Sequence, residues 1–143
     1  MMSKFAAAIP FRRNAAGELE LLLVTSRKKR RWVIPKGAVR GMLPHASAAR
    51  EAFEEAGVLG VIGREQTGVY CQRKTDASGK KQEIAVAAFP LFVNTQLRSW
   101  PEMSMRKRKW LGALEAIDMV EDAQLRRVLE IFSHDFKIDN PPV

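Results

Sequence analysis

The chain has 143 residues, of which 46% are hydrophobic and 28% are charged, and it contains a single cysteine. These proportions are typical of one folded domain, and they exclude a disordered chain and a fold held by internal disulfides. The formal net charge of +8 favours a polyanionic partner, for which nucleic acid is a secondary candidate.

The cysteine content and the apolar runs bear on location. Cys71 has no second cysteine to pair with, so the chain suits a reducing compartment and we expect it in the cytoplasm. The N-terminal segment Met1–Arg13 is broken by Pro10, unlike the apolar core of a signal peptide. The longest apolar run, Ile84–Val93, is about half the length that a membrane-spanning helix needs, so we expect no membrane partner.

The first third of the chain is typical of strands. Lys4–Phe11 and Glu18–Thr25 are rich in apolar residues, and Asn14–Gly17 between them has the composition of a turn. Trp32–Ile34 predicts a short strand that ends before a proline. The glycine-containing segment Lys36–Leu43 then predicts a loop.

A helix follows this loop. Pro44 suits the first turn of a helix, the alanine-rich sequence after it predicts a helix to about Ala56, and Gly57 is a natural C-terminal stop.

The segments after this helix complete the pattern of a sheet followed by two helices. In chain order we expect strands at Val58–Ile62, Thr67–Gln72 and Gln82–Val93, a turn at Asp76–Gly79 between the last two strands, helices at Leu114–Val120 and Glu121–Phe132, and a frayed tail at Ile138–Val143.

Three carboxylates share one face of the first predicted helix. At about 100° per residue, Glu54 and Glu55 lie within roughly 60° of Glu51. The same count groups the apolar side chains of the helix against the sheet, so the acidic edge is expected to face outward or into a cleft. The apolar group comprises Ala49, Ala52, Phe53 and Ala56.

Like charges at this spacing repel one another by roughly a few tenths of a kcal/mol per pair. A divalent cation bound among them would make the net interaction favourable. Magnesium prefers such hard oxygen ligands together with phosphate oxygens. Glu51, Glu54 and Glu55 are therefore candidate metal ligands, and Arg50 is placed to pair with Glu54 four residues on. The alternative is an ordinary solvent-exposed helix in which this pair is a routine surface contact.

The sequence around the carboxylates resembles a known family. Arg50–Val58 resembles the second half of the Nudix box, R-E-hydrophobic-x-E-E-x-G-hydrophobic, and Trp32–Gly37 resembles the strand and loop that lead into it. A weaker similarity joins the chain to the branch that hydrolyses diphosphoinositol polyphosphates and diadenosine polyphosphates. It rests on Thr25–Arg27, Trp100, Glu102, Arg106–Arg108, Trp110 and Glu115–Ile117.

The resemblance implies an α+β Nudix fold, with a mixed β-sheet sandwiched between α-helices. We expect a single Nudix hydrolase domain over residues 1–137 and a tail over residues 138–143. The implied activity is that of a magnesium-dependent pyrophosphohydrolase, with manganese as a substitute ion. A metal-activated water would attack phosphorus in a phosphoanhydride of a highly phosphorylated small molecule, a diadenosine polyphosphate or a diphosphoinositol polyphosphate.

Roles follow for individual residues. Glu54 and Glu55 are the leading metal ligands, with Glu51 as a ligand or the general base and Arg50 as the partner of Glu54. A phosphate pocket is expected at Arg27, Lys36 and Gly37, through two cations and backbone N–H groups. A further carboxylate often completes such sites, and Glu102 is the first candidate and Glu83 the second.

One part of the family pattern is missing. The full box, G-x5-E-x7-R, places its first glutamate eight residues before Arg50, where this chain has Met42, and the loop after Gly37 is one residue short. We expect this departure to affect the catalytic rate and the affinity for metal more than the type of reaction. Two alternatives stay open: a nucleoside diphosphate derivative or an RNA 5′ end as substrate, and a non-catalytic anion or nucleic-acid binder on the same scaffold.

Overall fold

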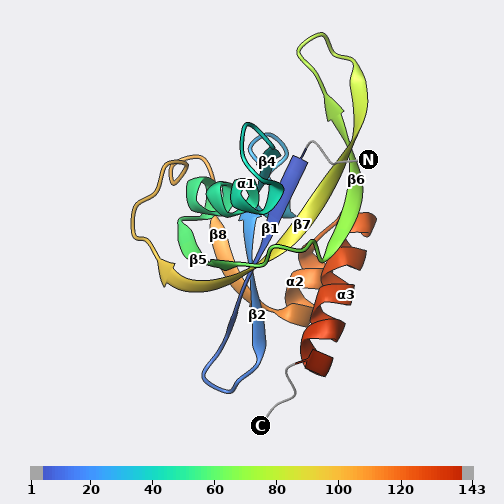
Figure 1. Ribbon diagram of the computed structural model, residues 1–143. Coiled ribbons are helices and arrows are strands. Elements are labelled where there is room, and N and C mark those ends of the chain that lie inside the picture. The colour runs from blue at the N-terminus through green and yellow to red at the C-terminus, as the bar shows by residue number, and fades with distance from the viewer. Residues whose placement is uncertain (1–4, 140–143) are drawn as a thin grey trace.

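The computed structural model describes residues 5–139, which form a mixed β-sheet with helices on both of its faces (Figure 1). This is the α+β arrangement that the sequence predicts. In chain order the elements are β1 (Phe5–Arg13), β2 (Leu19–Thr25), β3 (Trp32–Val33), β4 (Lys36–Ala38), α1 (Pro44–Glu51), the π-helix η1 (Ala52–Ala56), β5 (Val58–Ile62), β6 (Gly68–Thr75), β7 (Lys81–Gln96), β8 (Arg108–Gly112), α2 (Ala113–Met119) and α3 (Ala123–Asp139).

The sheet is organised around β1 and β7. These two strands run parallel to each other, and every other pairing in the sheet is antiparallel. The path β3-β2-β1-β7-β5 is joined by β4 on β1, β6 on β7 and β8 on β2. No helix of the described residues is long and apolar enough to cross a membrane.

Two hydrophobic cores lie on opposite faces of the sheet, because successive side chains of a strand point to opposite sides. Ala6 and Ala8 of β1 are buried on the face that α1 covers, whereas Ala7 and Ile9 are buried on the face that α2 and α3 cover. The α1 side is rich in alanine, with Ala48, Ala52 and Ala56 from α1 and η1 all fully buried. Such small side chains let the helix backbone approach the sheet closely.

The helix that carries the carboxylates begins and ends as predicted. Pro44 occupies its first turn, and Gly57 follows its last residue in the left-handed conformation, with φ of 65°. Its last five residues form a π-helix, which the uniform count of about 100° per residue does not anticipate. One expectation is wrong, because Phe53, predicted on the buried side of the helix, is 36% exposed. Glu55 is only 5% exposed, so of the two orientations expected for the acidic edge, outward or into a cleft, this side chain does not take the outward one.

Some boundaries also differ from the expected ones. Residues 36–38 form strand β4 against β1, inside the segment expected to be a loop. Strands β6 and β7 make a longer hairpin than expected, which projects from the body of the sheet (Figure 1). Helix α3 continues to Asp139, two residues into the expected tail, and residues 140–143 lie outside the described part of the chain.

The core beneath α3 gives a test of the fold. Leu129 is fully buried there, so Leu129→Ala should lower the free energy of unfolding by about 2 to 5 kcal/mol, because it removes buried methyl groups and leaves a cavity. Urea denaturation measures the loss. Ile131 on the same helix is 38% exposed, and Ile131→Ala should cost clearly less. Equal losses for the two variants would contradict the placement of α3.

Candidate active site

The three predicted carboxylates lie close together in the sequence but in different surroundings. Glu51 is the last residue of α1 and is half-buried. Glu54 lies in η1, and its Oε1 accepts a hydrogen bond of 3.0 Å from Nε of Arg50, which is the pair that the sequence predicts. Glu55 is buried, so the acidic edge of the helix turns partly into the protein rather than wholly outward.

Glu51 and Glu55 form a carboxyl pair. Their side chains hydrogen-bond each other, which requires a proton between them, since two ionised carboxylates have no donor. Burial raises the pKa of Glu55 to about 8, and the nearby Glu51 and Glu102 add to the rise. Burial also raises the pKa of Glu51, followed by repulsion from Glu54. The pair therefore holds a proton at neutral pH.

Arg106 is the cation nearest to this pair. Its Nη2 lies 3.5 Å from Oε2 of Glu55, while its Nε donates to Oε1 of Glu102 over 2.9 Å and its Nη1 donates to the backbone oxygen of Thr25 over 3.1 Å. The Arg106 side chain is only 11% exposed, so the guanidinium and both carboxylates form a largely buried charge cluster. The electrostatic effect of Arg106 lowers the pKa of Glu55, but burial outweighs it.

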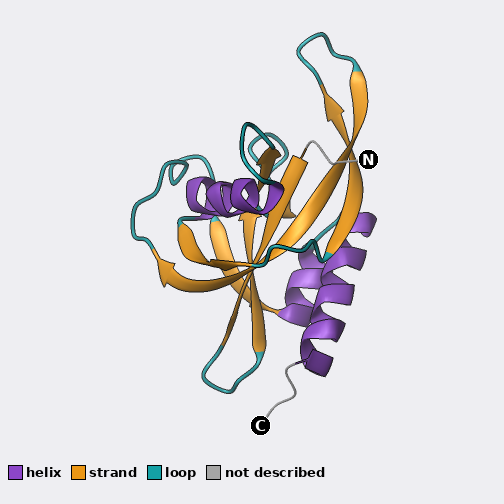
Figure 2. Ribbon diagram, viewed as in Figure 1, coloured by secondary structure: helices purple, strands orange, loops and turns teal. Residues whose placement is uncertain are grey.

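The loop from β7 to β8, residues 97–107, brings Arg106 and Glu102 to the helix (Figure 2). The backbone N–H of Glu102 donates to the oxygen of Glu54 over 3.0 Å. The indole Nε1 of Trp100 donates to the oxygen of Glu55 over 3.1 Å. These bonds satisfy carbonyl groups at the end of the helix, where no further turn can accept them.

Arg108 fastens the base of this loop. Its Nη1 donates to the oxygen of Ala56 over 2.9 Å and its Nη2 to the oxygen of Leu97 over 2.7 Å, and its guanidinium carbon lies 3.8 Å from the Trp100 ring centre. A cation at a helix C-terminus is favoured by the helix dipole. A Cβ at Gly57 would lie 2.7 Å from the Trp100 ring, so glycine also makes room for the loop.

Lys36 and Gly37 lie beside the carboxylates, on strand β4. A Cβ added at Gly37 would lie 2.4 Å from Cδ of Glu51, so only glycine leaves space for that carboxyl group. Burial lowers the pKa of Lys36, and the charges of Glu55 and Glu51 act against this effect. The structure thus brings Lys36 and Gly37 together with two of the predicted metal ligands.

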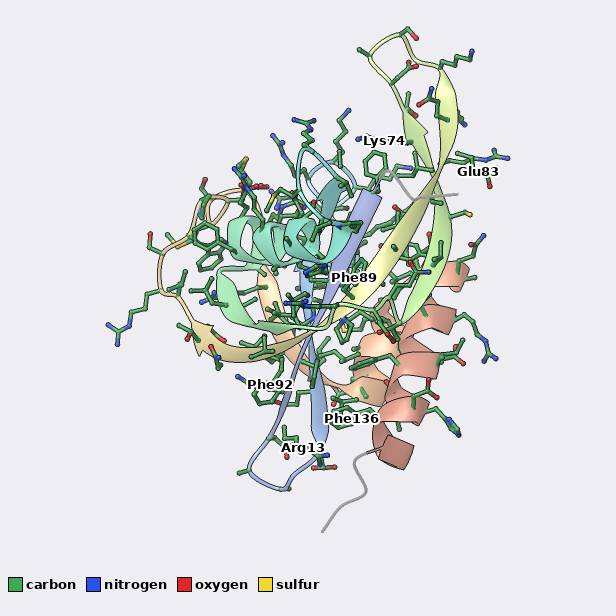
Figure 3. The ribbon with its side chains drawn as sticks, viewed as in Figure 1. Arg13, Lys74, Glu83, Phe89, Phe92 and Phe136 are labelled. Carbon is green, nitrogen blue, oxygen red and sulfur yellow. The ribbon has the colours of Figure 1, made fainter. Side chains whose placement is uncertain are left out.

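Two other predicted residues lie elsewhere. Arg27 is exposed in the turn between β2 and β3, and within the described residues it makes no hydrogen bond or ion pair with the carboxylates. Glu83 is exposed on β7, opposite Arg73 in the projecting hairpin and away from α1 (Figure 3). Of the two candidates for an additional carboxylate, Glu102 is the one beside the pair.

The roles of Arg106, Arg108 and Trp100 toward the helix were not anticipated from the sequence. All three appear in the weaker family similarity, but nothing in their local pattern shows that they meet residues about 50 positions earlier in the chain. The only local signal is their high density of positive and aromatic side chains after β7.

The carboxylates are the groups of this site that could hold a magnesium ion. Within the described residues, no three acidic, histidine or cysteine side chains are arranged to hold a metal ion together. Glu54 is paired with Arg50, and Glu51 and Glu55 share a proton. Their chemistry fits nonetheless, because these residues offer hard oxygen donors whose mutual repulsion a divalent cation would relieve. Binding would require loss of the shared proton.

Comparisons with known proteins agree with the fold. The family model described as NUDIX domain matches residues 2–130. Nudix hydrolase 21 of Arabidopsis thaliana, a chloroplastic protein, is 34% identical over 131 residues, which cover 87% of this chain but only 63% of the relative. Diphosphoinositol polyphosphate phosphohydrolase 3-alpha of Mus musculus is 35% identical over 82% of this chain and 69% of its own length. The crystal structure of the C. elegans Ap4A hydrolase superposes with a TM-score of 0.67 at 25% identity, covering 95% of this chain and 99% of that one.

The raised pKa of Glu55 makes the stability of the metal-free protein depend on pH. The pKa of Glu55 is about 8 in the folded state against an ordinary 4.5, so its contribution to stability is complete below about pH 4.5 and is lost as pH rises through 8. Urea denaturation with a chelator at several pH values should show this loss for the wild type and a flatter profile for Glu55→Gln.

Glu130→Gln, which removes an exposed carboxylate of α3, is the control for loss of charge. Parallel profiles for the wild type and Glu55→Gln would show that Glu55 does not hold a proton in the folded state.

Proposed function

Because the chain belongs to the Nudix family, we propose that it hydrolyses phosphoanhydrides as a divalent-metal-dependent pyrophosphohydrolase. The observation that carries the proposal is the buried pair of Glu51 and Glu55, with Arg106 and Lys36 as neighbouring cations. Perturbed carboxylates beside cations are typical of catalytic sites. A surface helix with only a structural role would not need a buried pair of carboxyl groups that share a proton.

Magnesium ions, when bound, would supply positive charge that stabilises the phosphate oxygens as the anhydride opens. Glu54, Glu55 and Glu51 would hold them, and Glu102 is the candidate for an additional carboxylate. Arg50 orients Glu54 through their ion pair, and Gly37 leaves space for Glu51. Glu51 is more accessible to water than Glu55, which suits it to accept the proton of the attacking water.

Two cations lie near these carboxylates and would bind phosphate groups of the substrate. Lys36 is half-buried beside Glu55, and Arg106 spans Glu55 and Glu102. An incoming phosphate chain would give both cations a further anionic partner. Arg27, on its exposed turn, would act only on phosphates farther from the cleaved bond.

For the substrate we propose a highly phosphorylated small molecule, of the diadenosine polyphosphate or diphosphoinositol polyphosphate kind. The printed names of the mouse and C. elegans relatives, and the exposed basic segment 27–31, support this class. A nucleoside diphosphate derivative or an RNA 5′ end is the alternative within the same chemistry, and side-by-side turnover of such a panel separates them. The cytoplasmic location remains a proposal that rests on the lone cysteine.

The proposed chemistry predicts that Glu54→Gln lowers kcat for magnesium-dependent hydrolysis by about 100-fold or more, because a metal ligand and its charge are lost. Phosphate or nucleotide release across a magnesium titration measures the change. Glu115→Gln, at an exposed position of α2, is the matched control and should keep wild-type turnover. Full activity in Glu54→Gln would rule out the site, and no activity of the wild type with any substrate would favour a non-catalytic anion binder.

The close approach of Gly37 to Glu51 gives a second prediction. Gly37→Ala should lower kcat by about 10- to 100-fold, because the new Cβ must displace the Glu51 carboxyl group by about an ångström. Steady-state kinetics and thermal unfolding together show whether the loss is catalytic. At Gly112 an added Cβ meets only Glu115 Oε1, at 3.8 Å, so Gly112→Ala should be neutral. Unchanged kcat in Gly37→Ala would contradict the role given to Glu51.

A further inference from the structure

The edges of the sheet differ in how they are protected from pairing with a further strand. An edge strand presents unpaired N–H and C=O groups to which another strand can bind. Proteins block such edges by keeping the strand short, by placing charged side chains on it or by covering it with a helix. Within the part of the chain that the structure describes, the strands with a single partner strand are β3, β4, β5, β6 and β8.

Four of these edge strands carry such a block. β3 and β4 have only two and three residues. The N–H of Cys71 on β6 donates to Oε1 of Gln124 on α3 over 2.8 Å, so the helix covers part of that edge. β8 carries Arg108 and Lys109 among its five residues.

Strand β5 lacks all of these features. It has five residues, Val-Leu-Gly-Val-Ile, and none of them is charged. Its three central residues, 59–61, are exposed. An apolar and exposed edge strand is a site at which another chain can add a strand to the sheet.

The side chains of β5 extend the apolar surface beyond the edge. Val58 and Ile62 pack in the core under α1, so Leu59 and Val61 between them point to the opposite face of the sheet. Val61 is directly paired with Phe92 of β7, and both side chains are exposed. Helices α2 and α3 lie beside the right-hand half of the sheet in Figure 1, whereas β5 lies at the left, away from them. The apolar strip therefore lies at the surface.

The backbone groups at the open edge are those of the even-numbered residues of β5. The N–H of Leu97 donates to the oxygen of Gly57 over 2.8 Å, and the N–H of Gly63 donates to the oxygen of Pro90 over 2.8 Å. Both glycines therefore bond toward β7. Since successive residues of a strand direct their backbone groups to alternate sides, the odd-numbered residues between these glycines also bond toward β7. The N–H and C=O groups of the even-numbered residues point away from β7.

We propose that β5 pairs with β5 of a second copy of this chain, antiparallel, about a two-fold axis at Gly60. Gly60 then lies opposite Gly60 of the other copy, and Val58 lies opposite Ile62, so every outward N–H meets an outward C=O and about six hydrogen bonds form. Leu59 lies opposite Val61 on a shared face, which joins the apolar strips of the two copies. The inference does not depend on the proposed function.

Charge also favours a second copy at this strand. The chain has a net charge of +8, so two copies repel each other where their basic surfaces meet. Residues 58–66 contain one cation, Arg64, and one anion, Glu65, so this repulsion is small at β5. In the antiparallel pair the exposed Arg64 of each copy lies toward the C-terminal end of η1 of the other, where the helix dipole favours a cation. The match is reciprocal, as a two-fold axis requires.

Sedimentation equilibrium of the full chain tests the pairing. A five-residue strand makes a small interface, so the concentration should range from about 1 µM to about 500 µM to cover a micromolar Kd. The mass should rise from that of one chain toward that of two. Val61→Lys should raise the dimer Kd about 10-fold or more, because two ammonium groups enter the apolar interface of each dimer. Val61 is 65% exposed in the single chain, so the variant should keep the thermal unfolding of the wild type.

Val69→Lys is the matched control. Val69 is an exposed valine on the neighbouring strand β6 and lies outside the open edge of β5. The same charge added there should leave the dimer Kd unchanged.

The register of the two strands has its own test. Leu59→Lys and Val61→Glu should each prevent self-association, but an equimolar mixture of these two variants should form a heterodimer, because the new ammonium group lies opposite the new carboxylate. A mixture of Leu59→Lys and Val61→Lys should stay monomeric, since like charges then lie opposite each other. In the wild type, NMR should show slower exchange of the Gly60 and Ile62 amide hydrogens at high concentration than at low concentration.

Three results would overturn the inference. One is the mass of a single chain over the whole concentration range. Another is a dimer whose Kd is the same in the wild type, Val61→Lys and Val69→Lys, which would place the interface elsewhere. The third is a dimer that Val61→Lys weakens but in which the Gly60 amide exchanges equally fast at all concentrations, which would show contact without strand pairing.

Discussion

The burial of Glu55 next to Glu51 is the constraint to which the rest of the site responds. A carboxylate removed from water is costly unless a cation or a proton compensates it. Here both compensate in part, since Arg106 lies 3.5 Å from Glu55 and a proton is shared with Glu51. Arg106 is in turn held by Glu102 and by the backbone oxygen of Thr25. The two carboxyl groups thus share one proton and keep part of their negative charge. A further cation beside them would favour loss of that proton.

The end of the helix and the loop 97–107 depend on each other. The helix ends at Gly57, and the carbonyl groups of its last turn accept hydrogen bonds from Trp100, from the backbone of Glu102 and from Arg108. No residue of the loop 97–107 is fully buried, and these polar contacts together with the stacking of Arg108 on Trp100 fix its course. Arg106, the cation beside Glu55, is therefore positioned by the same contacts that satisfy the carbonyl groups at the end of the helix.

Local patterns in the sequence predict much of the fold. Pro44 and Gly57 bound the helix as expected, and apolar segments separated by turn residues locate the main strands. The burial of Glu55 is not predictable from its residue type, because ionisable side chains are rarely buried unless a partner compensates them. The approach of Arg106 to Glu55 depends on loop docking between distant segments. Met42, which replaces the first glutamate of the box, is 38% exposed in the loop before α1.

We propose that the carboxyl pair gives up its shared proton when a metal ion binds. Calorimetric titration of magnesium near pH 7, in buffers with different enthalpies of ionisation, counts the protons that binding releases. The wild type should release about one proton per protein molecule, because the pKa of Glu55 is about 8, and Glu55→Gln should release almost none. Magnesium binding to the wild type without proton release would show that the pair holds no proton for the metal ion to displace.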